Sequence, residues 1–299
     1  MANLKEMRLR IVSVKSTQQV TRAMKMVSAA KLRKAQDAII QIRPYAEKLH
    51  EILVNLVAQN STSDFENKYS DHPEVKKILI VAITSNRGLC GGFNANVVKK
   101  IEELVTTVYA PFHQKGAVDI MAIGKKGADG LKAKNITMSG TIHQLFDGLQ
   151  YSSAEEIAQG LMDAYSHGEY DRIDLVYNQF KNAAIQKLTV EQFLPVEIIE
   201  DEPLEKSAHH YINNYIFEPN VHDIISTVIP RSLKIQFYKA ILDSVASEHG
   251  ARMTAMHKAT DNASELVREL NLQYNKARQS AITGEILEIV SGANALKSS

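Results

Sequence analysis

The stretch LKEMRLRIVSVKSTQQVTRAMKMVSAAKLRKAQDAIIQI, residues 4–42, decides how this chain folds. Alternate steps of three and four residues from Leu4 reach Leu56, and the positions on this path are apolar except for those from Gln18 to Ser28. The path runs through Leu4, Met7, Ile11, Val14, Gln18, Thr21, Lys25, Ser28, Leu32, Ala35, Ile39, Ile42, Ala46, Leu49, Leu53 and Leu56. Such a spacing places one narrow apolar stripe along a helix, as in a coiled coil. We therefore expect residues 1–59 to form one helix that pairs with another.

Residues 220–299 carry a weaker version of the same repeat and predict the second helix. The repeat runs through Leu242, Val245, His249, Arg252, Met256, Ala259, Ala263, Leu266, Leu270, Gln273 and Ala277. Both helices run into the same middle region, so they must pair antiparallel. Because helix rise is equal in both, residue 57 lies level with residue 221, and residue 1 lies near residue 277, within a turn or two. Residues beyond about 278 then have no partner in this chain.

This predicted overhang is unusually apolar for a lone helix. Ile282, Ile286, Ile289, Ala293 and Leu296 form one face. Leu287 and Val290 widen it. A solitary helix with such a face either aggregates or is covered by another protein.

The polar part of the first stripe, Gln18 to Ser28, falls level with residues 250–260, where the second seam also turns polar. That range holds Gly250, Arg252, Thr254, His257, Lys258 and Thr260. A second apolar stripe runs beside the first, about 100° around the helix. It consists of Val20, Ala23, Met24, Val27 and Ala30. Either the seam rotates locally onto the second stripe, or that stripe faces another protein. We favour the rotation.

Between the helices the pattern changes to short apolar runs separated by glycine, after the polar stretch 60–64. Residues 78–83, 118–123, 173–177 and 187–193 are typical of strands, and residues 94–109 and 154–166 of helices. The fold class is therefore α/β: a long antiparallel two-helix coiled coil with a small Rossmann-like α/β domain inserted. We assign 1–59 and 220–299 to the coiled coil, 74–205 to the α/β domain and 206–219 to a connecting strand or loop.

Composition excludes several classes of protein. The formal net charge of +1 gives no argument for nucleic-acid binding. Cys90 is the only cysteine, so the chain forms no internal disulfide or cysteine-based zinc site. Helix begins at once at the N-terminus, and eighteen apolar residues never run together. We therefore expect neither a targeting segment nor a transmembrane segment.

The sequence predicts no active site. The glycines at 88–92 follow a strand, but they match neither G-x-G-x-x-G nor the phosphate-binding G-x-x-x-x-G-K-[ST] pattern, and neither does Gly124-Lys125-Lys126-Gly127. We interpret residues 87–92 as a tight turn from strand to helix. Glu285 and Glu288 lie one turn apart on the last helix, where no pocket could enclose them. We expect no catalytic residue, no metal and no cofactor.

Several segments resemble one known family. Residues 278–293, RQSAITGEILEIVSGA, are similar to the C-terminal signature of the gamma subunit of F-type ATP synthases. Residues 15–30, 86–92, 251–253 and 259–262 also resemble that family, in order and spacing. The resemblance covers essentially the whole chain and is of the bacterial type.

The resemblance implies a non-catalytic central-stalk rotor that couples ion (proton) flow to ATP synthesis and regulates ATPase activity. Three alpha and three beta subunits would surround the coiled coil. The epsilon subunit and the membrane c-ring would contact the α/β domain, which would form the foot of the coiled-coil shaft. The chain would be peripheral, on the cytoplasmic side of the inner (plasma) membrane, and catalysis would occur on the beta subunits.

The resemblance also assigns site residues. Arg278 and Gln279 would form a polar catch against a beta subunit. The bearing is the surface on which the end of the last helix would turn inside the ring of alpha and beta subunits. It would contain Thr283, Glu285 and Glu288 with Ile282, Ile286 and Ile289. Contacts to an acidic beta segment would come from Arg87 and from Lys31, Arg33 and Lys34. The same three residues of the first helix are also consistent with a solvated face.

The chain departs from the family at Gly284, where a larger polar residue is common; glycine inside a helix costs about 1 kcal/mol relative to alanine. It also lacks the cysteine pair of chloroplast members, so we expect no thiol control. A non-rotary coiled-coil scaffold with a ligand-binding α/β domain is the alternative hypothesis. A nucleotide-dependent oxidoreductase is disfavoured, because the dinucleotide fingerprint is missing.

Overall fold

The computed structural model describes residues 4–59, 69, 75–196 and 221–297. Contacts divide the chain into two units. The two-helix unit comprises Met1–Ala29 and Arg252–Ser299, and the sheet unit comprises Ala30–Ala251. The assignment of a shaft and a foot domain stays a prediction, and its connecting segment, 206–219, lies outside the described residues.

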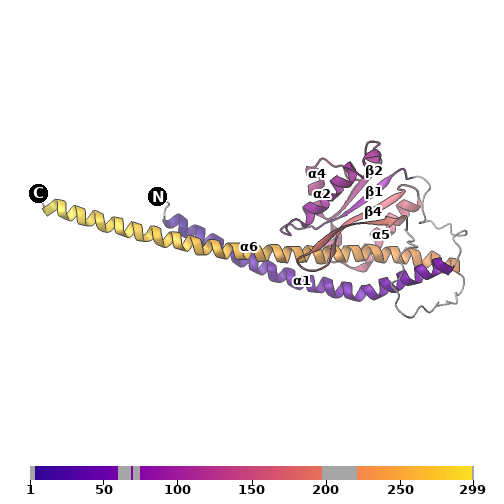
Figure 1. The fold of residues 1–299 in the computed structure, drawn as a ribbon, viewed down its shortest axis with the longest axis horizontal. Helices are drawn as coiled ribbons and strands as arrows, with labels where there is room; N and C mark the ends of the chain where they lie inside the picture. Colours follow the sequence, from indigo (N-terminus) through magenta and orange to yellow (C-terminus); the bar gives the residue numbers. More distant parts are fainter. Residues whose placement is uncertain (1–3, 60–68, 70–74, 197–220, 298–299) are drawn as a thin grey trace. The chain divides into compact units, whose positions relative to one another are not determined.

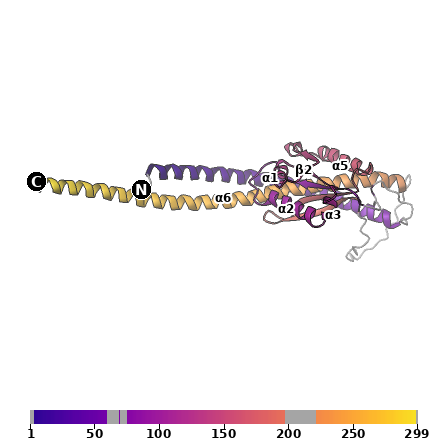
Figure 2. The same cartoon turned by 90° about the horizontal axis from the view of Figure 1, so that it is seen from above.

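Two long helices run through both units: α1, Leu4–Gln59, and α6, Val221–Lys297. In the two-helix unit they lie side by side and antiparallel (Figures 1 and 2). Each member of the predicted α1 stripe whose burial is described is buried or half-buried. On α6 the predicted positions Leu266 and Gln273 are exposed, and the seam passes through half-buried Val267 and Tyr274 instead.

Hydrogen bonds across the seam fix its register. Gln18 Nε2 donates to Ser264 Oγ at 2.7 Å, and Thr260 Oγ1 donates to Thr21 Oγ1 at 2.9 Å. The same register brings Leu4 level with residues 277–278, within about one turn of the prediction. The antiparallel pairing is therefore confirmed.

The predicted rotation of the seam is wrong. Thr21 and Ser28 are buried, so the polar positions stay in the seam. The second stripe remains outside, with Val20 55% and Val27 57% exposed. The polar residues can be buried because their hydroxyl and amide groups pair across the seam or with their own helix, as Ser28 Oγ does with Met24 O at 2.8 Å.

The sheet unit contains one five-stranded sheet in the order β3-β2-β1-β4-β5. Its strands are β1 (Ile78–Ile83), β2 (Val118–Ile123), β3 (Gly140–Ile142), β4 (Arg172–Phe180) and β5 (Gln186–Leu194). The first four are parallel and β5 is antiparallel to β4. Every residue of β1 is buried, as expected for a central parallel strand covered on both faces.

Helices cover both faces of the sheet. On one face lie α2 (Phe93–Thr106), the short α3 (Ala110–His113) and α4 (Lys125–Ala133). On the other lie α5 (Tyr151–Ser166) and the part of α6 around Phe237, which share one apolar cluster with the sheet. A 3-10 turn, η2, spans Gln144–Asp147. The predicted Rossmann-like α/β domain is therefore confirmed.

The sequence did not predict α4 or β3. Gly124 and Gly127, which match no phosphate-binding pattern, are both needed for close packing. Gly124 has φ +107°, and a Cβ there would lie 2.4 Å from the Thr84 carbonyl oxygen. A Cβ at Gly127 would lie 2.4 Å from Thr84 Oγ1. These glycines let α4 start against the end of β1.

Candidate functional site

The last turns of α6 hold most of the predicted site residues, and all of them are exposed. The seam with α1 ends at Ala277, which is half-buried. Arg278 and Gln279 follow it directly, then Glu285 and Glu288 further along. The structure therefore places the predicted catch and bearing residues on one length of α6 that is exposed in the described part of the chain.

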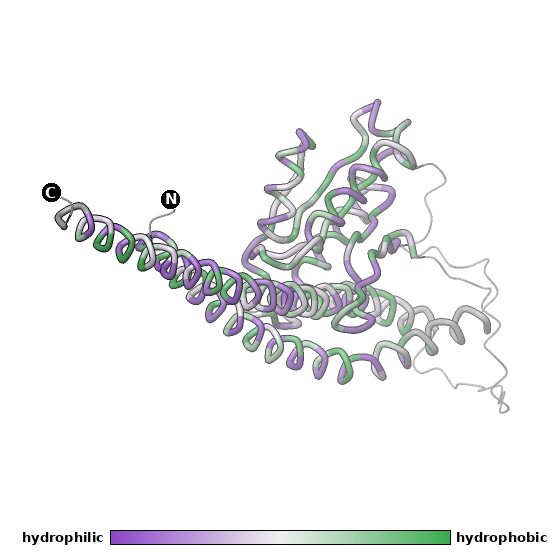
Figure 3. Tube along the Cα trace, turned by 60° about the vertical axis from the view of Figure 1, so that its left-hand side comes forward, coloured by the Kyte–Doolittle hydropathy of each residue, from purple (hydrophilic) through white to green (hydrophobic). Residues whose placement is uncertain are grey.

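The apolar side chains of this helix end also face solvent. Their exposed fractions are Ile282 49%, Ile286 55%, Leu287 60%, Ile289 71% and Val290 49%. Hydrophobic and hydrophilic residues alternate along these turns (Figure 3). Burying an apolar side chain of this size contributes about 1.5–3 kcal/mol. This end of α6 is therefore a surface suited to a partner.

Local bonding within this end is that of an ordinary helix. The Thr283 hydroxyl donates to the Gln279 carbonyl at 2.9 Å, one turn back. At Gly284 a Cβ would meet nothing within 4 Å, so no contact in the chain requires glycine there. Within the described residues, no packing contact explains why position 284 is glycine.

The basic residues of α1 lie on its outer side in the sheet unit. Lys31, Arg33 and Lys34 are exposed, whereas their neighbours Leu32 and Ala35 are buried. Both interpretations of these residues, a solvated face and a partner-binding face, remain compatible with this placement.

Arg87 lies in the loop that connects β1 to α2, and it is exposed. The side chains of buried Ser85 and half-buried Asn94 hold this loop. The Ser85 hydroxyl donates to the Arg87 carbonyl at 2.7 Å, and Asn94 Oδ1 accepts from the Ser85 N–H at 3.0 Å. Asn94 Nδ2 also lies 3.3 Å from the Sγ of buried Cys90.

The backbone donors at the start of α4 are used within the protein rather than offered to a phosphate. The N–H of Lys125 donates to Asn86 Oδ1 at 3.0 Å, that of Lys126 to the Ser85 carbonyl at 3.0 Å, and that of Gly127 to Thr84 Oγ1 at 3.0 Å. A phosphate loop needs such donors to point into an open site. The segment of residues 124–127 is therefore the packed start of a helix and not a phosphate loop.

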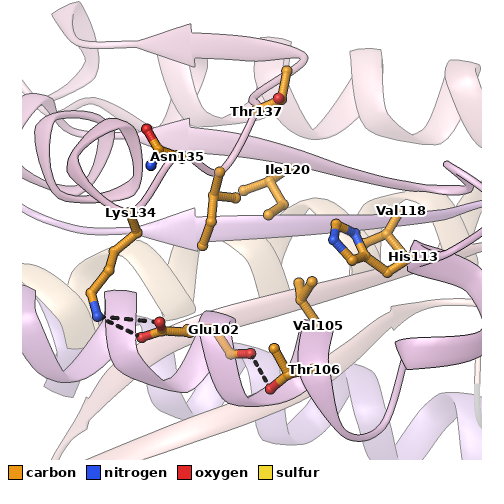
Figure 4. Close-up of a pocket in the computed structure, with 10 residues that line it drawn as sticks. Glu102, Val105, Thr106, His113, Val118, Ile120, Lys134, Asn135 and Thr137 are labelled. Carbon is orange, nitrogen blue, oxygen red and sulfur yellow. Dashed lines mark hydrogen bonds and ion pairs between the residues drawn. The ribbon is translucent and has the colours of Figure 1, made fainter.

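One shallow pocket of about 270 Å³ lies between α2 and the segments flanking β2 and α4 (Figure 4). Lys134 and Glu102 form an ion pair at 3.0 Å at one end, and His113 and Val118 lie at the other. Open α/β sheets usually bind ligands at the carboxyl ends of their strands. This pocket lies at the amino end of β2, and its main charges neutralise each other, so we assign it no ligand.

Buried acidic groups in the sheet unit serve packing. Asp174 is fully buried and receives bonds from Arg172 Nε at 3.1 Å and from the Tyr109 hydroxyl. Burial and the Asp174 carboxylate raise the pKa of Tyr109. Burial raises the pKa of Asp243 to about 6, against the lowering effect of Lys239 and Arg43.

Among the described residues, no group of three His, Cys, Asp or Glu side chains could hold a metal ion. Within the same ranges, no helix is long and apolar enough to span a bilayer.

Comparison with known proteins explains this arrangement. Residues 3–296 match the family model described as ATP synthase. The ATP synthase gamma chain of Flavobacterium psychrophilum is 56% identical over 297 residues, covering 99% of this chain and 100% of the relative. That of Cytophaga hutchinsonii is 50% identical, covering 99% of each. The chain belongs to the ATP synthase gamma chain family. The resemblance inferred from the sequence is therefore confirmed.

Solved structures of ATP synthases support the fold of this gamma-family chain. One chain of the Euglena gracilis mitochondrial ATP synthase, in an assembly of OSCP, F1 and c-ring, superposes with a TM-score of 0.68. It shares 23% identity, with 98% of this chain and 94% of that chain covered. A chain of the Tetrahymena thermophila central stalk and c-ring assembly gives a TM-score of 0.56 at 24% identity, covering 80% and 99%.

Sequence reasoning missed one feature of the loop in this gamma-family chain. Leu89 adopts a left-handed backbone, φ 63°, and its side chain is 63% exposed. The sequence offers no signal for it, because leucine rarely adopts the left-handed region.

Proposed function

We propose that this chain is the central-stalk rotor subunit of an F-type ATP synthase. It would couple ion (proton) flow through the membrane sector to ATP synthesis on the beta subunits, regulate ATPase activity, and catalyse no reaction itself. One observation carries the proposal: a chain matched to this family over residues 3–296 ends in an exposed apolar helix. A pair of helices that only tethers or spaces two partners has no use for such an end.

The sequence of the helix end suggests how the rotor acts. A shaft changes its neighbours only if it contacts them unequally, because a ligand shifts an equilibrium by its difference in affinity for the two states. Apolar side chains such as Ile286 and Ile289 have little directional preference, so they can slide against the surrounding alpha and beta subunits. Arg278 and Gln279 can form directional bonds that hold one orientation and break in the next.

The proposed partners are three alpha and three beta subunits around the helices, with the epsilon subunit and the c-ring at the foot. Support comes from the names of the relatives and from neighbours described with F1 and a c-ring. The complex would lie at the inner (plasma) membrane, on its cytoplasmic side, with this chain peripheral. Arg87 would contact an acidic beta segment, and Lys31, Arg33 and Lys34 would assist it.

Deletion of all residues after Ala277 tests the proposal. The residues from Arg278 to Asn294 are exposed apart from half-buried Gly284, so the truncated chain should fold with an unchanged melting temperature of the sheet unit. In membrane vesicles that contain the rest of the complex, ATP hydrolysis should no longer drive ion pumping. The matched control replaces exposed Val108 in the sheet unit with alanine and should leave pumping unchanged.

Two results would decide against the rotor. Assembly and pumping that survive the truncation unchanged would make the helix end dispensable. A purified chain that stays monomeric and does not associate with alpha and beta subunits would favour the scaffold hypothesis.

A further inference from the structure

In the sheet unit, one part of α6 is enclosed on all sides over several turns. Every residue from 240 to 250 is buried or half-buried. The part around Phe237 belongs to the apolar cluster that α6 shares with the sheet. Apolar burial is the main force that holds such a helix in a fold. Polar side chains on the same part of α6 therefore need an explanation beyond holding the helix against the sheet.

Gln236, Ser247 and Gly250 lie on one face of α6, because steps of eleven and three residues return a helix to nearly the same side. This face meets strands β4 and β5. Gln236 Nε2 donates to Glu191 Oε1 at 2.8 Å, and the other oxygen of this carboxylate accepts from the Tyr177 hydroxyl at 2.5 Å. Glu191 thereby links α6 to both strands.

The second polar contact lies about three turns further along α6. Ser247 is fully buried, and its hydroxyl donates to the Asn178 carbonyl at 2.9 Å. Asn178 is also buried, and its side-chain amide donates to the Phe93 carbonyl at 3.3 Å. Because Phe93 begins α2, this series of bonds connects α6 through β4 to a helix on the opposite face of the sheet.

The third contact joins α6 to the turn between β4 and β5. A Cβ at Gly250 would lie 3.3 Å from both the Cα and the carbonyl oxygen of Ala183, so a larger residue would displace the turn. The side-chain oxygen of Asn182 accepts from the N–H groups of Ala184 at 3.0 Å and Ile185 at 2.8 Å. The turn is therefore stiffened by its own bonds, and its backbone lies directly against the helix.

We propose that the contact of α6 with the β4–β5 hairpin is a rotational lock, which prevents α6 from turning relative to the sheet under load, and that Gln236, Ser247 and Gly250 are its positioning residues. Apolar contacts resist separation but have little directional preference. Hydrogen bonds depend on direction, and a satisfied buried network fixes one arrangement. The inference rests on the proposed function, in which torque passes between the α/β domain and the far end of α6.

The demands of folding alone do not account for this network. Apolar groups of the same shape in place of two hydrogen-bonded partners leave stability nearly unchanged. The bonds also reach several elements, because Glu191 lies on β5 and Asn178 lies on β4 and contacts α2. A torque on α6 is therefore spread over three elements of the sheet unit.

The test uses the purified complete complex in closed membrane vesicles, driven by ATP hydrolysis. Gln236→Met combined with Ser247→Ala removes both hydrogen bonds and keeps most of the packed volume. The hydrolysis rate with an uncoupler present should be unchanged. The largest ion gradient that hydrolysis sustains should fall, because the load on the helix is then greatest and the lock slips. Ser247→Ala alone should give a smaller loss, and it decides the question if the double variant does not assemble.

Amide hydrogen exchange of the isolated chain measures the lock without the other subunits. Ser247→Ala should raise the exchange rates of β5 and of residues 240–250 about fivefold, the change in an opening equilibrium that one ordinary hydrogen bond produces. Gly250→Ala should act in the same direction, because its Cβ displaces the turn. The matched control is Ser139→Ala, which removes a hydroxyl that donates to the Ile120 carbonyl at 3.3 Å. It should leave both the exchange of β5 and the largest gradient unchanged.

The negative results differ in meaning. If the unmodified chain sustains no ion gradient, the proposed rotor function fails and this inference fails with it. If the unmodified chain sustains a gradient and the variants sustain the same one, the rotational lock is overturned while the rotor function stands. An equal loss of gradient in Ser139→Ala would also overturn the lock, because the loss would then follow from lower stability alone.

Discussion

The sheet unit and the two-helix unit bury their apolar residues in different ways. In the sheet unit, β1 is buried along its whole length, and apolar clusters fill both faces of the sheet. In the two-helix unit a single seam is buried, and part of that seam is polar. Apolar residues remain outside on both helices, among them Leu9, Met26 and Leu272. The sheet unit covers two apolar clusters within this chain, and the two-helix unit has the surface of one component of a larger assembly.

The geometry of a helix pair accounts for this difference. Each helix of a pair presents one narrow stripe to its partner, and the rest of its circumference faces outward. In the sheet unit the apolar clusters on both faces of the sheet are covered, and residues that stay exposed, such as Val108 at 60% and Ile185 at 58%, lie outside these clusters. Outward apolar residues in the two-helix unit therefore mark surfaces for other chains, whereas the buried apolar residues of the sheet unit report on packing alone.

Phe237→Ala in the sheet unit should have the largest effect on stability. Its ring is fully buried, and the ring centroid lies 5.9 Å from that of Phe193 within the cluster shared by α6 and the sheet. Loss of a core phenylalanine costs about 3–5 kcal/mol. Chemical denaturation followed by circular dichroism should show this loss for the isolated chain.

The counterpart in the two-helix unit is Ile286→Ala. Its side chain is 55% exposed, so the free energy of unfolding of the isolated chain should change by less than about 0.5 kcal/mol. Its effect should be seen only in the assembled complex, as weaker association. A large loss of stability from Ile286→Ala in the isolated chain would contradict the exposure of this end of α6 among the described residues.

Asp243→Asn tests whether ionisation of the buried Asp243 side chain lowers the stability of the sheet unit as the pH rises. Burial raises the pKa of Asp243 from 3.8 to about 6, so the folded chain binds this proton more tightly than the unfolded chain. The proton therefore stabilises the fold. This contribution is complete below about pH 4 and is lost as the pH rises to about 6, amounting to about 2–3 kcal/mol.

Asparagine resembles the protonated acid and does not titrate. The difference in unfolding free energy between Asp243→Asn and the unmodified chain should therefore grow in favour of the variant from pH 4 to pH 7. Denaturant melts at several pH values measure it, and Asp37→Asn, at an exposed position of α1, provides the control. A difference that stays constant with pH would show that Arg43 and Lys239 already compensate the buried charge.

The parts of the fold that sequence reasoning predicted are those set by long periodic patterns. The α1 seam outside its polar part was predicted because its three-four spacing continues for many turns, and β1 because six consecutive apolar residues end at a polar turn. The failures are short and depend on contacts distant in the sequence. Helix α4 was missed because its glycines are needed for close packing against Thr84. Thr84 lies 40 residues before Gly124 in the sequence, so no local pattern reveals this contact.

The candidate site divides in the same way. The exposure of the isoleucines near the end of α6 follows from the register, because α6 extends beyond the residues that pair with α1. The polar layer was misjudged, since hydrophobicity alone does not reveal that Gln18 and Ser264 satisfy each other. Leu89 was missed because backbone strain is a property of conformation, and no pattern of residue types states that a leucine occupies the left-handed region.

Gly284→Ala should have the smallest effect on stability. It adds a single Cβ atom to the exposed end of α6 and leaves the sheet unit unchanged. A Cβ at this position meets nothing within 4 Å, so the substitution adds no contact inside the chain. Alanine favours helix over glycine by about 1 kcal/mol. Amide hydrogen exchange should therefore slow around residues 280–288 and stay unchanged in the sheet unit. If the softness of the helix end matters to the rotor, the same variant should alter pumping while the melting temperature of the sheet unit stays constant. Unchanged exchange at residues 280–288 would mean that glycine does not limit the helix there, and the helix end would then be as rigid as the paired part of α6.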